Sequence, residues 1–80
     1  MEPYSTSPRR RDRLIVHVYA ADGRHVQVAL YGWAVGSERG RRTATWEAAV
    51  YADTEEPLRP ADEDRWRDDL AAAVFTRAAE

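Results

Sequence analysis

The side chains that could do chemistry in this chain are two histidines, three serines and scattered carboxylates. Nucleophilic catalysis needs a nucleophile, a base and an orienting group within hydrogen-bond reach. Ser5 and Ser7 lie in a polar N-terminal stretch, and Ser37 lies in a glycine-containing loop with no evident base. His17 and Glu47 are expected on one sheet face, but on outer strands that another strand separates. A lone surface pair is the favoured interpretation, so we predict that the chain is not an enzyme.

The same residues give no metal or cofactor motif. His17 and His25 lack zinc-site spacing, and the chain has no cysteine to complete such a site. The acidic run at 62–64 lacks the spacing of a calcium loop and fits the negative charge that a helix N-terminus favours. The four glycines are isolated and match no phosphate-cradling loop. We therefore predict no bound metal and no cofactor.

The elements that must position these residues are three strands and one helix. Residues 14–20, 24–35 and 43–52 have the alternation and composition of strands, and Pro60 opens a helical pattern that extends to about Ala79. Residues 1–13 hold two prolines and four arginines with few large apolar groups, which indicates a disordered arginine-rich tail. The predicted fold is α+β: residues 14–80 form a single β-β-β-α domain, in which a three-stranded antiparallel meander packs one face against the C-terminal helix.

The turn at 21–23 can be predicted from side-chain parity. A two-residue Asp-Gly turn would split the aliphatic residues between the two sheet faces. A three-residue loop pairs Ala20 with Arg24 and sets Val18 opposite Val26 on one face. That loop is a type I turn with a bulge, in which Gly23 takes the left-handed conformation.

The predicted sheet then has two unlike faces. The aliphatic face, packed on Trp66, Leu70 and Val74, holds Leu14, Val16, Val18, Val26, Val28, Leu30, Trp46, Ala48 and Val50. The second face is rich in aromatic residues, which are favoured at protein interfaces. We predict that it binds a partner through His17, Tyr19, Tyr31, Trp33 and Tyr51. If Leu30 lies opposite Ala48, Gly32 lies beside Trp46, whose indole covers the bare backbone.

Charge supplies a second candidate surface. Antiparallel pairing brings the N-terminal tail and the loop at 36–42 to one end of the sheet. The predicted arginine pole there consists of Arg9, Arg10, Arg11, Arg13, Arg39, Arg41 and Arg42. Acidic residues, including Asp53, Glu55 and Glu56, are expected at the opposite end. An arginine pole can bind nucleic acid or an acidic protein partner, with strong salt dependence for nucleic acid.

Two functions remain open from sequence alone. The first is a small non-enzymatic interaction module or regulator, whose aromatic face pairs with a second copy or with another protein. The alternative is a nucleic-acid-binding regulator that uses the arginine pole, with a small-molecule sensor as a weaker third possibility. No stretch reaches transmembrane length and no signal peptide follows the basic residues, so we predict a cytoplasmic protein without a membrane partner.

Overall fold

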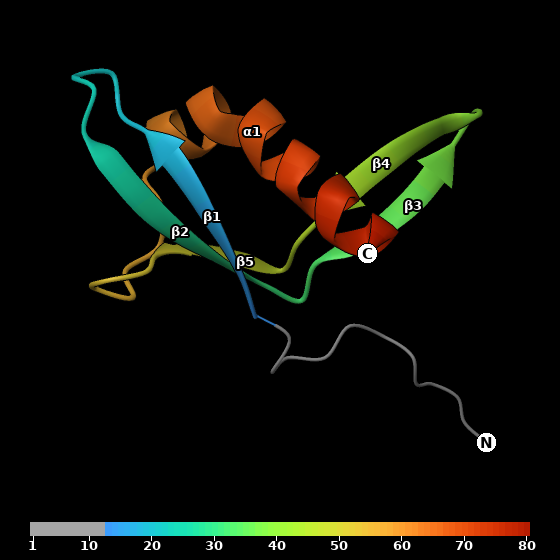
Figure 1. Cartoon of the computed structure of the whole chain (residues 1–80), viewed down its shortest axis with the longest axis horizontal. Helices are drawn as coiled ribbons and strands as arrows, with labels where there is room; N and C mark the ends of the chain where they lie inside the picture. Colours follow the sequence, from blue (N-terminus) through green and yellow to red (C-terminus); the bar gives the residue numbers. More distant parts are fainter. Residues whose placement is uncertain (1–12) are drawn as a thin grey trace.

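The computed structural model describes residues 13–80 of the chain (Figure 1). The elements in chain order are β1 (Arg13–Tyr19), β2 (His25–Tyr31), β3 (Ala34–Glu38), β4 (Arg41–Thr45), β5 (Ala48–Tyr51) and α1 (Pro60–Ala79). All strand pairs are antiparallel, and a single helix follows them, which confirms the predicted α+β fold. The strands are divided between two sheets, one of order β1-β2-β5 and one formed by β3 and β4. The predicted single three-stranded meander is therefore split.

The β1–β2 hairpin has the predicted bulged turn. The Ala20 N–H donates to the Arg24 carbonyl at 2.7 Å, the Gly23 N–H donates to the Ala20 carbonyl at 2.9 Å, and Gly23 has a φ of 83°. Val18 lies opposite Val26, as side-chain parity predicts. An Asp22 carboxylate oxygen also accepts the Arg24 N–H at 3.0 Å and closes the turn locally.

The second predicted strand bends sharply at Gly32, and the third bends beside it at Glu47. Tyr31 pairs with Ala48 before the bend, and Ala34 pairs with Thr45 after it, so the bend divides one hairpin without shifting its register. Gly32 has a φ of 65°, a left-handed conformation that suits glycine. The predicted register was wrong by one residue, because Leu30 lies opposite Ala49 instead of Ala48. Gly32 is therefore covered by the side chain of Glu47 and not by Trp46.

The bend also changes which side chains face the core. Beyond it, Trp33, Val35, Ala44 and Trp46 all pack against the core, although Trp33 was predicted on the second face. In β5, on the side of the bend nearer the three-stranded sheet, Ala49 and Tyr51 pack against the core, in place of the predicted Ala48 and Val50. Unbroken alternation cannot give this pattern, because a left-handed residue in a strand reverses the facing of the side chains after it.

Helix α1 lies across the angle between the two sheets and packs on β1, β3 and β4 (Figure 1). Its buried residues are Trp66, Leu70 and Val74, as predicted. Pro60 occupies the start of the helix, and Asp62 and Glu63 lie in the first turn, where the helix dipole favours acidic groups. The core gathers the aliphatic residues of β1 and β2, Leu58 and this apolar stripe.

Candidate functional site

The five residues predicted to bind a partner do not form one surface. Trp33 and Tyr51 are half-buried against the core, and Tyr31 is half-buried on the opposite face of the sheet. His17 and Tyr19 are exposed, as predicted, and Tyr19 is the one large hydrophobic residue within 13–80 that is strongly exposed, at 68%. The predicted aromatic face is therefore reduced to the part of it that lies on β1.

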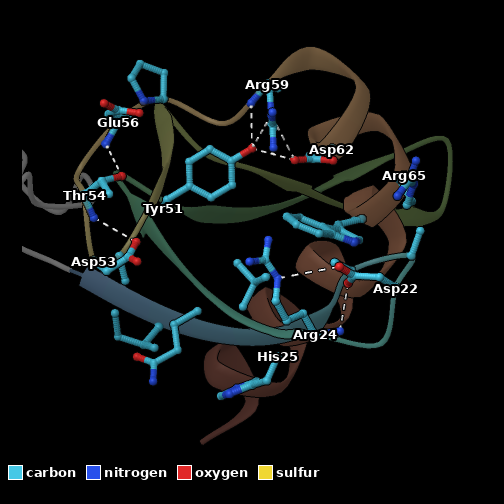
Figure 2. A pocket seen from close by; sticks show the side chains of 18 of the residues that line it. Asp22, Arg24, His25, Tyr51, Asp53, Thr54, Glu56, Arg59, Asp62 and Arg65 are labelled. Carbon is cyan, nitrogen blue, oxygen red and sulfur yellow. Dashed lines mark hydrogen bonds and ion pairs between the residues drawn. The ribbon is translucent and has the colours of Figure 1, made fainter.

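Tyr51 joins the end of β5 to the start of the helix. Its hydroxyl donates to Asp62 Oδ2 at 2.5 Å and accepts hydrogen bonds from the backbone N–H and Nε of Arg59, at 3.3 and 3.2 Å (Figure 2). The hydrogen bond that Arg59 donates to the Tyr51 hydroxyl, together with the charge of Asp62, raises the pKa of Arg59 above its ordinary value. Because its polar partners are Arg59, directly before α1, and Asp62, in the first turn of α1, we interpret Tyr51 as a structural anchor.

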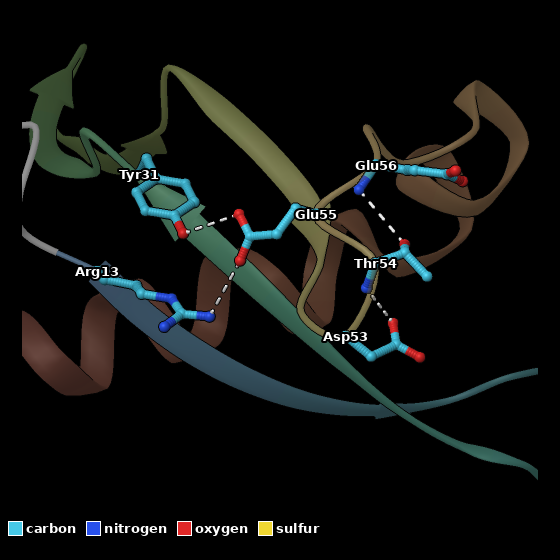
Figure 3. A network of polar contacts seen from close by, with 6 residues as sticks. All are labelled: Arg13, Tyr31, Asp53, Thr54, Glu55 and Glu56. Atoms are coloured by element: carbon cyan, nitrogen blue, oxygen red, sulfur yellow. Dashed lines mark hydrogen bonds and ion pairs between the residues drawn. The ribbon is translucent and has the colours of Figure 1, made fainter.

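Tyr31 is covered by a polar bridge from the segment after β5. One carboxylate oxygen of Glu55 accepts the Tyr31 hydroxyl hydrogen bond at 3.5 Å, and the other lies 3.6 Å from the Arg13 guanidinium (Figure 3). Glu55 reaches this position because it has a φ of 63° and its N–H donates back to the Tyr51 carbonyl at 2.7 Å. The prediction that Glu55 lies at the end opposite Arg13 was wrong, since β5 ends opposite Val28, midway along β2.

The loop arginines lie on the β3–β4 hairpin, hereafter the arginine arm (Ala34–Thr45). Glu38 lies opposite Arg41, and the two turn residues are Arg39, with a φ of 54°, and Gly40, with a φ of 80°. Two left-handed residues are typical of a type I′ hairpin turn. The Arg42 guanidinium, opposite Ser37 near the turn, lies 4.7 Å from the ring centroid of Phe75, which ties the arm to α1. Of the predicted tail arginines, Arg9, Arg10 and Arg11 lie outside the described residues.

Three exposed side chains of the β1–β2 hairpin form a compact group, hereafter the edge patch (His17, Tyr19 and His25). His17 Nδ1 and His25 Nε2 are 2.8 Å apart, so one ring donates a hydrogen bond to the other. The Tyr19 and His25 rings lie 5.6 Å apart. His25 was not among the predicted site residues, although the three-residue turn sets it opposite Tyr19 and could have revealed it. Glu47, the other residue considered with His17, packs over Gly32 instead.

A groove of about 1070 Å³ lies between the β1–β2 turn, the connection after β5 and the first turns of α1 (Figure 2). Its polar lining carries both signs of charge, with Arg24 beside Asp22 and Arg59 beside Asp62. Within residues 13–80, no group of three or more potential metal ligands is present. In the same segment, no helix is long and apolar enough to cross a membrane.

The geometry thus offers an exposed aromatic and histidine patch on the β1–β2 hairpin, and a basic two-stranded arm. The patch presents one large ring and two hydrogen-bonding imidazoles, which suit contact with another macromolecule. The arm presents guanidinium groups on a ribbon that stands apart from the three-stranded sheet (Figure 1). Comparison with known protein families, curated proteins and solved structures finds no match for this chain.

Proposed function

We propose that this chain is a small non-enzymatic interaction module, which associates with itself or with a protein partner through the edge patch. The observation that carries the proposal is the 68% exposure of Tyr19, on a sheet whose other aromatic residues are half-buried. Tyrosine is enriched among the few residues that carry most of the binding energy at protein interfaces. The adjacent imidazoles supply hydrogen-bonding groups around that ring.

The proposed surface is narrower than the aromatic face expected from sequence. Tyr51 is engaged by Asp62 and Arg59, and Tyr31 by Glu55, so these hydroxyls are used within the fold. Trp33 packs against the core. Among the five residues predicted to bind a partner, His17 and Tyr19 keep exposed side chains, and Tyr19 is therefore the position substituted to test the proposal.

The test compares Tyr19→Ser with Tyr19→Phe. Sedimentation equilibrium of the full chain measures self-association, and affinity capture from the source cell, after nuclease treatment, measures binding of other proteins. Loss of an interface tyrosine of this kind costs about 2 kcal/mol or more, so Tyr19→Ser should weaken association about 30-fold. Tyr19→Phe keeps the ring area and should stay within a few-fold of the unmodified chain. A monomeric chain that captures no protein, or a Tyr19→Ser variant that associates normally, contradicts the proposal.

A second candidate is nucleic-acid binding through the arginine arm. The specific observation in its favour is that Arg39 and Arg41 are exposed at the tip of a two-stranded ribbon. A two-stranded ribbon fits the major groove of duplex DNA, and arginine contacts both phosphates and guanine edges. Fluorescence anisotropy with duplex DNA and single-stranded RNA at several salt concentrations tests this candidate. Binding should weaken steeply with salt.

The matched variants for that measurement are Arg39→Ala with Arg41→Ala on the arm, and Arg65→Ala with Arg67→Ala on α1. Both pairs remove two exposed arginines, so they change the net charge equally. The arm pair should reduce the salt slope by about one for each lost phosphate contact, and the helix pair should leave it unchanged. No binding at low salt, or equal effects of the two pairs, excludes the arm as a nucleic-acid site.

A further inference from the structure

Within residues 13–80, the outer edge of β1 is unpaired over the whole strand. β1 is the terminal strand in the order β1-β2-β5, and no strand within residues 13–80 pairs its other side. The Ala20 N–H donates to Arg24, and antiparallel alternation then directs the peptide groups of Leu14, Val16 and Val18 toward β2. The peptide groups that point outward belong to Arg13, Ile15, His17 and Tyr19.

This edge lacks the features that usually prevent edge-to-edge pairing. Natural edge strands carry lysine, proline, inward-pointing charges or bulges, or they are very short. β1 has the sequence RLIVHVY and pairs with β2 in unbroken register over seven residues. Its one charged residue, Arg13, stands at the first position. A strand of this kind is a template on which another strand can be added.

We propose that the occupant of this edge is β1 of a second copy, antiparallel and centred on a two-fold axis at Val16. The inference rests on the proposed function, because it specifies how the chain self-associates. This centring pairs Arg13 with Tyr19 of the second copy and Ile15 with His17 of the second copy. Every outward peptide group of Arg13–Tyr19 then gains a hydrogen-bonding partner. The result is a continuous six-stranded antiparallel sheet.

Charge and shape favour this register because the strand is complementary to itself. Arg13 lies directly opposite the exposed Tyr19 of the second copy, which brings that ring beside the guanidinium that Glu55 holds at 3.6 Å. The two copies of Arg13 stay at opposite ends. On the core side, Val16 meets its own copy and Leu14 meets Val18, so the apolar layer continues across the axis. The axis is normal to the sheet, so both α1 helices lie on one face.

If the two-fold axis lay one residue further along β1, the two copies of the strand would be less complementary. An axis at His17 would place the two His17 side chains directly opposite each other. It would also set Arg13 opposite Ala21, in the turn beyond the end of β1, where no strand residue is available. The centred register is therefore the one in which the whole strand is paired and the exposed tyrosine gains a cationic neighbour.

The experiment compares His17→Pro with His17→Ala in the full chain. Proline removes a backbone N–H, and at His17 that N–H points to the proposed partner. Alanine keeps this N–H, so the two variants differ at the peptide group that the added strand needs. Both variants lose the same His17–His25 hydrogen bond, which makes the pair a matched control. Circular dichroism verifies that each variant folds.

Sedimentation equilibrium should show a dimer for the unmodified chain and for His17→Ala. The His17→Pro dimer should dissociate at least tenfold more readily than the His17→Ala dimer. The register is measured on the unmodified chain by isotope-filtered NMR of a mixed labelled and unlabelled sample. We expect Hα–Hα contacts between Leu14 and Val18 of different copies. This measurement needs no variant, so the proposal stays testable if His17→Pro does not fold.

Each contrary outcome separates the inference from the proposed function. A monomer that captures a protein in a Tyr19-dependent manner overturns the inference and leaves the proposed function intact. A dimer that His17→Pro does not weaken, or one with contacts between Val16 and Val18 of different copies, overturns the inference alone. A monomer that captures nothing overturns both.

Discussion

The bend at Gly32 gives the sharpest prediction about how this chain folds. Gly32 has a φ of 65°, and a methyl group built on it would lie 2.5 Å from Cδ and 2.6 Å from Cγ of Glu47. Gly32→Ala therefore introduces two separate costs. One is the left-handed conformation of a residue with a Cβ, and the other is displacement of the Glu47 side chain.

The two costs can be estimated separately. A non-glycine residue in the left-handed region costs about 1–2 kcal/mol, and the lower entropy of the unfolded alanine chain offsets about 0.4–1 kcal/mol of it. Glu47 is exposed, so its side chain can move, and we assign this displacement about 1 kcal/mol, the order of a forced rotamer change. The expected loss is roughly 1–3 kcal/mol, which in a domain of this size lowers the Tm by roughly 5–20 °C.

Urea unfolding followed by tryptophan fluorescence measures the loss, with Gly23→Ala as the matched control. Gly23 has a φ of 83° and no heavy atom within 4 Å of the added carbon, so Gly23→Ala reports the backbone cost alone. The double variant Gly32→Ala/Glu47→Ala, compared with Glu47→Ala, removes the contact and retains the backbone cost. Its remaining loss should approach that of Gly23→Ala.

Two results would refute the reasoning. If Gly32→Ala is as stable as the unmodified chain, the bend does not need a left-handed residue at this position. If Gly32→Ala loses stability but Glu47→Ala recovers none of it, the close approach of Glu47 contributes nothing and only the backbone cost remains.

Three further substitutions test the anchor, the core and the arm. Tyr51→Phe removes the hydroxyl that Asp62 and Arg59 share, and urea unfolding should show a loss of about 1–3 kcal/mol; a loss below about 0.5 kcal/mol contradicts the anchoring role. Leu70→Ala, at a fully buried position, should lose about 2–5 kcal/mol in the same assay, and a smaller loss would mean that the helix packs differently. Arg39→Asn should raise the Tm by a few degrees, because asparagine tolerates a φ of 54° better than arginine; an unchanged or lower Tm argues against strain at the turn.

The part of the candidate site on the β1–β2 hairpin was predictable, because its geometry depends on residues close together in sequence. The spacing around Asp22 and Gly23 fixed the hairpin register, and that register places Tyr19 and His17 on the face opposite the core. The rest of the predicted aromatic face depended on pairing between strands far apart in sequence. A one-residue change in that pairing moved Tyr51 to the core side, because side chains alternate with a period of two.

By itself, the sequence determined the α+β order of elements, the bulged β1–β2 turn and the buried stripe of α1, because each follows from local spacing and capping rules. Only the tertiary structure decided that Gly32 adopts a positive φ, that Trp33 turns inward and that Glu55 folds back over Tyr31. A glycine within a strand pattern permits a bend without requiring one. Here the bend brings Trp33 and Trp46 against the core that α1 also covers, so it depends on contacts that no local pattern contains.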